Sequence, residues 1–249
     1  MSAAATARLA GLVRGAGRVV ALTGAGISVP SGIPDFRSPG TGLWANVDPM
    51  AVAHIDVWRR DPEHFWGFYG GRFALLRDKV PNGAHRALVE LEARGRLEAV
   101  VTQNIDGLHR AAGTRDLIEV HGTIGTSSCL ACGASYPLDE ARARLEAADD
   151  GVPRCDCGAP LKPDVVLFGE LLPERALARA QVLAASADLL LCVGSSLEVW
   201  PAAGLPETTL DAGGELAIVT QGPTPYDDAA AVRLGGDVVE ELAALVAAL

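Results

Sequence analysis

The sequence is poor in the features that mark several classes of protein. It has five cysteines in 249 residues, 5% aromatic residues, and 21 Lys and Arg against 31 Asp and Glu. So few cysteines exclude a disulfide-dense scaffold, and 49% hydrophobic residues exclude a disordered or collagen-like chain. A net charge of -10 lacks the positive field that sequence-independent nucleic-acid binding needs, so no direct nucleic-acid partner is expected.

Long hydrophobic runs are also missing. No uninterrupted apolar stretch approaches the ~20 residues that cross a bilayer, and 189–193 is interpreted as a buried strand. The first 34 residues contain three arginines and no acid, but the apolar core of a signal peptide does not follow them. We therefore expect no membrane span, a first helix ahead of a strand at 18–23, and a cytoplasmic location.

Strand-like apolar runs alternate with helix-like stretches, which is typical of a parallel α/β fold in one or two domains. The expected strands are 18–23, 98–102, 117–120, 164–168, 188–193 and 215–220. The expected helices are 84–94, 174–186, 237–248 and one that begins near Asp61 as its N-cap. The pattern predicts a doubly wound sheet.

Two segments interrupt this alternation and are interpreted as insertions into the α/β core. Residues 30–80 are rich in Pro and Gly and hold most of the aromatic residues. Residues 124–163 hold four of the five cysteines around a helix-like piece at 138–148.

Glycine-rich segments follow the first expected strand. Gly24 and Gly26 would let a backbone approach a pyrophosphate, but Val29 replaces the third glycine of the dinucleotide fingerprint. A plain tight turn therefore remains an alternative. The loop 32–44 has three Gly, two Pro and side chains for stacking and phosphate pairing, which suits a lid over a ligand or an irregular surface loop.

Polar residues follow three expected strands at their carboxyl ends, where open α/β sheets bind ligands. The Gln103–Asp106 segment can read the carboxamide and hydroxyls of a nucleotide, or cap a helix. The Gly194–Ser196 segment suits a phosphate or ribose, or a plain turn. His121 could act as a general base with an ordinary pKa near ~6.5, although a structural role is the alternative for any isolated histidine. The other four histidines are expected to be structural.

Four cysteines form two close pairs separated by 22 residues, Cys129 with Cys132 and Cys155 with Cys157. This spacing predicts a structural Cys₄ zinc site, in which four thiolates leave no open position for catalysis. Disulfides are the alternative, and the absence of a secretion signal disfavours them. Cys192 lies in an apolar strand and is expected in the core.

Taken in order, these motifs closely resemble the sirtuin family of NAD-dependent protein lysine deacylases. The resemblance covers nearly the whole chain through GAGIS, GIPDFRSPGTGLW, TQNID, HG, KPDVVLFGE, VGSS and GDVVE. It implies a Rossmann-like NAD-binding domain over 1–35, 81–123 and 164–249. A small domain would combine the cofactor loop and helical insertion 36–80 with the zinc module 124–163, one Zn²⁺ per chain, and NAD and acyl-lysine would meet between the domains.

The resemblance also implies roles for individual residues. His121 would be the catalytic base, with Asn104 as a second catalytic residue. The implied NAD-binding residues are Gly24, Ala25, Gly26, Phe36, Arg37, Gln103, Asn104, Ile105, Asp106, Gly194, Ser195, Ser196, Thr220 and Val238. Thr220 stands in a segment where many family members carry an Asn. The implied residues along the substrate peptide are Val165, Phe168, Gly169, Glu170 and Val199.

The implied reaction transfers the acyl group from lysine to ADP-ribose, releases nicotinamide and forms O-acyl-ADP-ribose, with neutral His121 removing a proton from a ribose hydroxyl. Deacetylation is favoured because 38–42 resembles the loop of the deacetylase classes. Desuccinylation or demalonylation is the alternative, because Tyr69 and Arg72 could bind a second carboxylate. A helix-surface pair is the structural interpretation of these two residues.

Two functions of other classes compete with deacylation. Mono-ADP-ribosyl transfer from NAD to protein would use the same pocket without an acyl-lysine strand. A non-catalytic NAD-sensing or zinc-scaffold module would tolerate the loss of His121. The expected partners are acyl-lysine proteins or peptides, and the sequence makes no prediction of oligomeric state.

Overall fold

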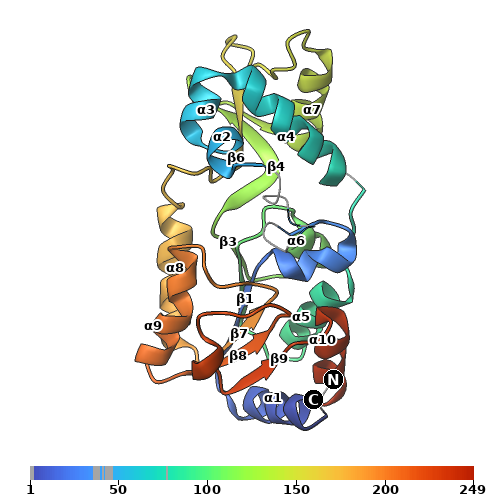
Figure 1. The fold of residues 1–249 in the computed structure, drawn as a ribbon, viewed down its shortest axis with the longest axis vertical. Helices are drawn as coiled ribbons and strands as arrows, with labels where there is room; N and C mark the ends of the chain where they lie inside the picture. The colour runs from blue at the N-terminus through green and yellow to red at the C-terminus, as the bar shows by residue number, and fades with distance from the viewer. Residues whose placement is uncertain (1–2, 36–39, 41, 43–46, 77) are drawn as a thin grey trace.

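The computed structural model describes residues 3–35, 40, 42, 47–76 and 78–249, and its strands form two sheets (Figure 1). The larger sheet has six parallel strands in the order β3-β2-β1-β7-β8-β9. They are β1 Val19–Thr23, β2 Ala99–Thr102, β3 Leu117–Glu119, β7 Leu189–Val193, β8 Glu215–Val219 and β9 Val232–Leu234. The order reverses between β1 and β7, which makes this a doubly wound, Rossmann-like sheet with its switch point there.

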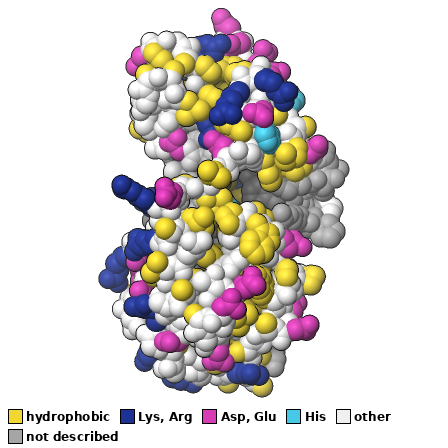
Figure 2. Space-filling model, turned by 90° about the vertical axis from the view of Figure 1, so that its left-hand side faces the viewer, with side chains coloured by type: hydrophobic (Ala, Val, Ile, Leu, Met, Phe, Trp, Pro, Cys, Tyr) yellow, Lys and Arg dark blue, Asp and Glu magenta, His cyan; other side chains and the backbone are white. Residues whose placement is uncertain are grey.

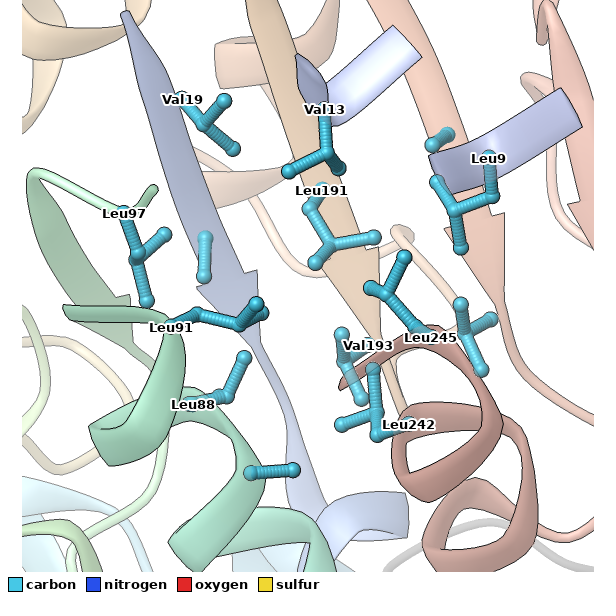
Figure 3. Packing of buried hydrophobic residues seen from close by; sticks show 14 of the residues in the cluster. Leu9, Val13, Val19, Leu88, Leu91, Leu97, Leu191, Val193, Leu242 and Leu245 are labelled. Carbon is cyan, nitrogen blue, oxygen red and sulfur yellow. The ribbon is translucent and has the colours of Figure 1, made fainter. Parts of the chain in front are cut away.

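Helices cover both faces of the large sheet. They are α1 Ala3–Gly15, α5 Gly83–Ala93 and α10 Val238–Ala247 on one face, and α8 Glu174–Ser186 and α9 Leu205–Asp211 on the other. Successive residues of β1 point to opposite faces, so Ala21 packs with the first group and Leu22 with the second. Figure 3 shows leucines of α5 and α10 converging on Leu191 of β7.

The smaller sheet has three antiparallel strands in the order β5-β4-β6. They are β4 Gly122–Cys129, β5 Ser135–Pro137 and β6 Leu161–Val165. Four helices pack with it: α2 Pro49–Val52, α3 Ile55–Arg60, α4 Pro62–Leu76 and α7 Leu138–Ala147. Trp58 and Trp66 both donate their indole N–H to the Leu161 carbonyl at 3.0 Å, which ties the helical insertion to β6.

Most expected elements are confirmed, including the first helix, the strands at 18–23 and 188–193, and the helix at 174–186. Asp61 caps α4 as expected, because its carboxylate accepts a hydrogen bond from His64 N at 2.9 Å. The prediction of a strand at 164–168 in the large sheet is wrong. The strand is β6, and it belongs to the small sheet, because Val165 and Leu167 are buried against the helical insertion and not against the large sheet.

Short elements complete the fold. They are α6 Leu108–Ala112 and the 3₁₀ helices η1 Ala25–Ser31, η3 Ala202–Gly204 and η4 Asp227–Ala229. The segment after the first glycines is thus a 3₁₀ helix with Pro30 inside it. Within the described part of the chain, no helix is long and apolar enough to cross a membrane.

Candidate active site between the two sheets

The loops that follow β1 and β7 pack directly against each other at the switch point. Gly24 N donates to the Val193 carbonyl at 3.0 Å, and Gly26 N donates to the Gly194 carbonyl at 2.7 Å. A Cβ at Gly24 would lie 2.8 Å from the Ser195 Cβ, which is too close for any side chain. Small residues are therefore required here so that the two loops can meet at the switch point.

Gln103 follows β2, the strand next to β1, and its side chain reaches the loop after β7. Its Nε2 donates to the Ser195 hydroxyl at 2.9 Å, and the same hydroxyl accepts from Leu197 N at 3.2 Å. The structure thus brings together side chains from adjacent parts of the sheet that the sequence separates by more than 90 residues.

Asn104 is buried, and its side chain is fixed by two acceptors. Its Nδ2 donates to the Gly24 carbonyl at 3.1 Å and to the Ser28 hydroxyl at 3.2 Å. Ser28 in turn donates to Asp106 Oδ2 at 2.7 Å, and Leu108 N donates to Asp106 Oδ1 at 2.9 Å. Burial raises the pKa of the Asp106 carboxyl, and these two hydrogen bonds oppose that rise. Sequence reasoning missed Ser28, although it lies inside the GAGIS motif.

A second buried network holds the backbone of Asn104. Asn104 N donates to Thr102 Oγ1 at 3.1 Å, Thr23 Oγ1 donates to the same oxygen at 2.8 Å, and His109 Nε2 bonds Thr23 at 2.9 Å. Burial lowers the pKa of His109 to about 3 and that of the adjacent His85 to about 4, so both rings are neutral at physiological pH.

His121 lies between β3 and β4, at the point where the chain passes from the large sheet to the small one. Its Nδ1 lies 2.9 Å from the Gln103 carbonyl, which can only accept, so Nδ1 carries the proton and Nε2 carries the lone pair. Burial lowers the pKa of His121, and the hydrogen bond to Gln103 partly opposes this. The neutral ring with a fixed tautomer has the form required of a general base.

The segment after β6 crosses from the small sheet toward α8, as Figure 1 shows. Val166 N donates to the His121 carbonyl at 2.8 Å, and Phe168 exchanges hydrogen bonds with Ala53 and Ile55 at 3.0 Å each. Phe168 and Gly169 are exposed. On the face in Figure 2 the surface is indented between the two parts of the molecule, with hydrophobic side chains on both sides of the indentation.

The remaining expected residues lie at separate places around the crevice. Thr220 and Val238 are buried at the end of β8 and the start of α10, Ile105 packs toward the helical insertion, and Ala25, Ser196 and Val199 are half-buried. Phe36, Arg37 and the side chain of Arg72 lie outside the described residues. Tyr69 is buried and stacks on Phe65 at 4.5 Å between ring centroids, so its ring is part of the core.

Four thiols converge at the far end of the small sheet. All four Sγ atoms lie within 4.8 Å of one another, with Cys129 to Cys157 at 3.5 Å and Cys132 to Cys155 at 3.4 Å. A tetrahedron of Zn–S bonds of ~2.3 Å has edges of roughly 3.8 Å, which fits this cluster. The shorter Cys-x-Cys pair is therefore compatible with the site.

Comparison with known proteins places these features in one family. The sequence profile of the Sir2 family matches residues 24–201, well over half of the chain. This chain belongs to the Sir2 family.

Relatives of this Sir2 chain are similar over most of their length. An NAD-dependent protein deacetylase of Caldivirga maquilingensis is 48% identical over 90% of this chain and 85% of its own. An NAD-dependent protein deacylase of Thermus thermophilus is 46% identical over 92% of this chain and 89% of its own. A solved Sir2 structure with a deacetylated p53 peptide and 3'-O-acetyl ADP-ribose has a TM-score of 0.92, 41% identity and 96% coverage of both chains.

Proposed function

We propose that this Sir2 protein is an NAD-dependent protein lysine deacetylase. The observation that carries the proposal is His121, a half-buried neutral imidazole whose Nδ1 is fixed by the Gln103 carbonyl and whose Nε2 keeps its lone pair. It stands beside the polar set of Gln103, Asn104 and Asp106 at the switch point, where doubly wound sheets bind dinucleotides. The relatives named above as NAD-dependent deacetylases support the same activity.

The donors and acceptors of the crevice fit a dinucleotide. Gln103 and Asn104 would hold the nicotinamide ribose, Ile105 and Asp106 the nicotinamide pocket, and 194–196 with Thr220 and Val238 the adenosine half. Because both Nδ2 hydrogens of Asn104 are used by Gly24 and Ser28, its Oδ1 is the atom left to contact a ligand. Bound NAD would supply the ADP-ribosyl group that accepts the acetyl group, with loss of nicotinamide.

His121 would act by proton transfer. Its Nε2 would take the proton of a ribose hydroxyl, and the positive charge that forms on the ring would be stabilised by the Nδ1–H bond to the Gln103 carbonyl. The burial that lowers the pKa keeps Nε2 unprotonated near neutral pH, so the base is ready without prior loss of a proton.

The peptide would lie along 165–170 and near Val199 as an added strand, a mode that relies on main-chain hydrogen bonds. Gly169 N–H has no hydrogen-bond partner among the described residues, and Gly169 is exposed. It therefore offers a donor to the backbone of an acyl-lysine peptide.

The activity itself is tested by incubating the protein with NAD and an acetyl-lysine peptide and identifying the products by mass spectrometry. Deacetylated peptide, nicotinamide and O-acetyl-ADP-ribose are expected in equal amounts. ADP-ribosylated peptide without O-acetyl-ADP-ribose would instead establish the transferase alternative.

Activity is expected to fall on acidification only below about pH 6.5, the ordinary pKa of histidine. The base must be neutral, so activity is present above the His121 pKa and is lost as the pH falls through it. Burial lowers that pKa, which moves the loss further toward acid. A profile of kcat/KM between about pH 5 and about pH 8 checks this. An acid limb centred above the ordinary value would contradict the assignment.

We further propose acetyl-lysine as the preferred substrate. Tyr69 packs in the core of the small domain against Phe65, which supports a structural role over carboxylate binding. Arg72→Met is then expected to change kcat/KM by no more than about twofold for both acetyl- and succinyl-lysine peptides. Arg60→Met, a nearby exposed substitution, is the matched control. A selective loss of succinyl-peptide turnover in Arg72→Met would favour the desuccinylase alternative.

We also propose a structural zinc ion and a cytoplasmic location for this protein. Cys129, Cys132, Cys155 and Cys157 would hold one structural Zn²⁺, and the groups that carry the chemistry lie outside this cluster. Thiols needed for such a site persist in a reducing compartment, which supports a cytoplasmic location.

A further inference from the structure

Lys162, in β6, is a buried lysine that the proposed reaction does not use. Its side chain is about nine-tenths buried, and its Nζ has three acceptors. These are the Pro163 carbonyl at 3.2 Å, the Val165 carbonyl at 2.9 Å and Glu170 Oε2 at 2.9 Å. Each hydrogen of the ammonium therefore has a partner, as a buried charge requires.

The acidic partner of Lys162 closes a tight turn. Glu170 Oε2 also accepts from Leu167 N at 2.9 Å, and Glu170 N donates to the Leu167 carbonyl at 3.0 Å. Gly169 lies inside this turn with a φ of 83°, in the left-handed region that favours glycine. Lys162 thus connects the rigid strand β6 to the turn 167–170.

The opposite side of the turn is anchored by the helical insertion. Phe168 bonds Ala53 and Ile55 through its backbone, and a Cβ at Gly169 would lie 2.6 Å from His54 Nε2. The Phe168 carbonyl and the Gly169 N–H belong to one planar peptide unit, so the bond from Ile55 N fixes the direction of the Gly169 N–H from this side. The other side of the turn is closed through the Glu170 carboxylate, which the ion pair with Lys162 holds in place.

We propose that Lys162 is a positioning residue for peptide binding, which acts through Glu170 to hold the turn 167–170, and with it the exposed Gly169 N–H, in place along the substrate backbone. This inference rests on the proposed function, because it takes the peptide to lie along 165–170. Without the ammonium, the Glu170 carboxylate keeps only the Leu167 N–H and turns toward water, which releases the turn. Peptide binding should weaken, while NAD binding and the proton transfer at His121 should not.

Lys162→Met is expected to raise the KM for an acetyl-lysine peptide roughly tenfold or more, with the KM for NAD and the kcat at saturating peptide within about threefold of wild type. Lys162→Arg keeps the charge and should restore a near wild-type peptide KM. Arg179→Met is the matched control, because it breaks the exposed 2.6 Å ion pair between α8 and Asp116. It should leave every constant unchanged.

The order of action is tested by a double-mutant cycle. Glu170→Gln should raise the peptide KM similarly. The double variant Lys162→Met with Glu170→Gln should have a peptide KM no higher than that of the single variant with the higher peptide KM. If Lys162→Met fails to fold, Glu170→Gln and Lys162→Arg carry the test. A peptide KM that stays at the wild-type value, or equal losses in the constants for NAD and peptide, would overturn the inference.

The failure of this inference can be told apart from failure of the proposed function. Wild-type protein that makes no O-acetyl-ADP-ribose refutes the function. The dissociation constant of a fluorescent acetyl-lysine peptide, measured for wild type and Lys162→Met in the absence of NAD, tests the positioning role independently. Equal dissociation constants refute the role even in an active enzyme.

Discussion

His121→Ala is expected to lower kcat/KM for an acetyl-lysine peptide by about 10²–10⁴-fold, the usual contribution of a positioned general base. The substitution removes the Nε2 lone pair and leaves the Gln103 carbonyl without its Nδ1–H donor. NAD and peptide should still bind, because their proposed contacts come from other residues. Steady-state kinetics and peptide binding by fluorescence anisotropy separate the two effects.

His64→Ala is the matched control for this variant. His64 is exposed in α4, and its ring has one hydrogen bond among the described residues, to the Ala51 carbonyl at 3.2 Å. It should keep wild-type kinetics. Full activity in His121→Ala would show that the base is another residue. Full peptide binding without activity in both His121→Ala and His64→Ala would favour the non-catalytic alternative.

Cys132→Ser is expected to remove zinc and unfold the small domain. Cys132 is exposed, so the loss of its sulfur costs little packing, and the effect reports the metal ligand itself. Structural zinc contributes folding free energy on the order of 10 kcal/mol in small modules. Zinc content should fall from about one per chain to near zero. The thermal midpoint should fall with it, and peptide turnover should be lost, since β4 and β6 join the cysteine cluster to the crevice.

Cys192→Ala provides the comparison for the zinc experiment. Cys192 is buried in β7, far from the cluster in the fold, and it should retain zinc while losing a modest amount of stability to a small cavity. Metal analysis and thermal unfolding measure both variants. Folded, active Cys132→Ser protein without zinc would contradict the structural role of the metal.

The sequence predicted the parts of the fold whose pattern is local. Strands such as β7 are continuous apolar runs, and α8 repeats its apolar residues at helical spacing, so both are evident without any tertiary context. The strand β4 was missed because it is largely polar, and β6, one of its two partners, lies on a distant segment. The three-residue strand β9 carries Arg233 at its centre and gives no apolar run.

The site divides in the same way. The motifs identified Gln103, Asn104 and His121 because polar residues at strand ends are conspicuous. They could not show that the His121 proton sits on Nδ1, that Ser28 links Asn104 to Asp106, or that Lys162 closes the 167–170 turn. Each of these depends on distances between side chains that only the folded chain defines.

His121 lies in the turn that joins the two sheets. Its preceding strand is β3 of the large sheet, β4 of the small sheet begins at the next residue, and its carbonyl is bonded to Val166 beyond β6. Gly122 crosses so close to Asp164 that an added Cβ would collide with its carbonyl. Because β4 begins directly after His121, a tilt of one sheet relative to the other would also turn the imidazole ring. A ligand that contacts both sheets would therefore act on the orientation of the ring that we propose as the base.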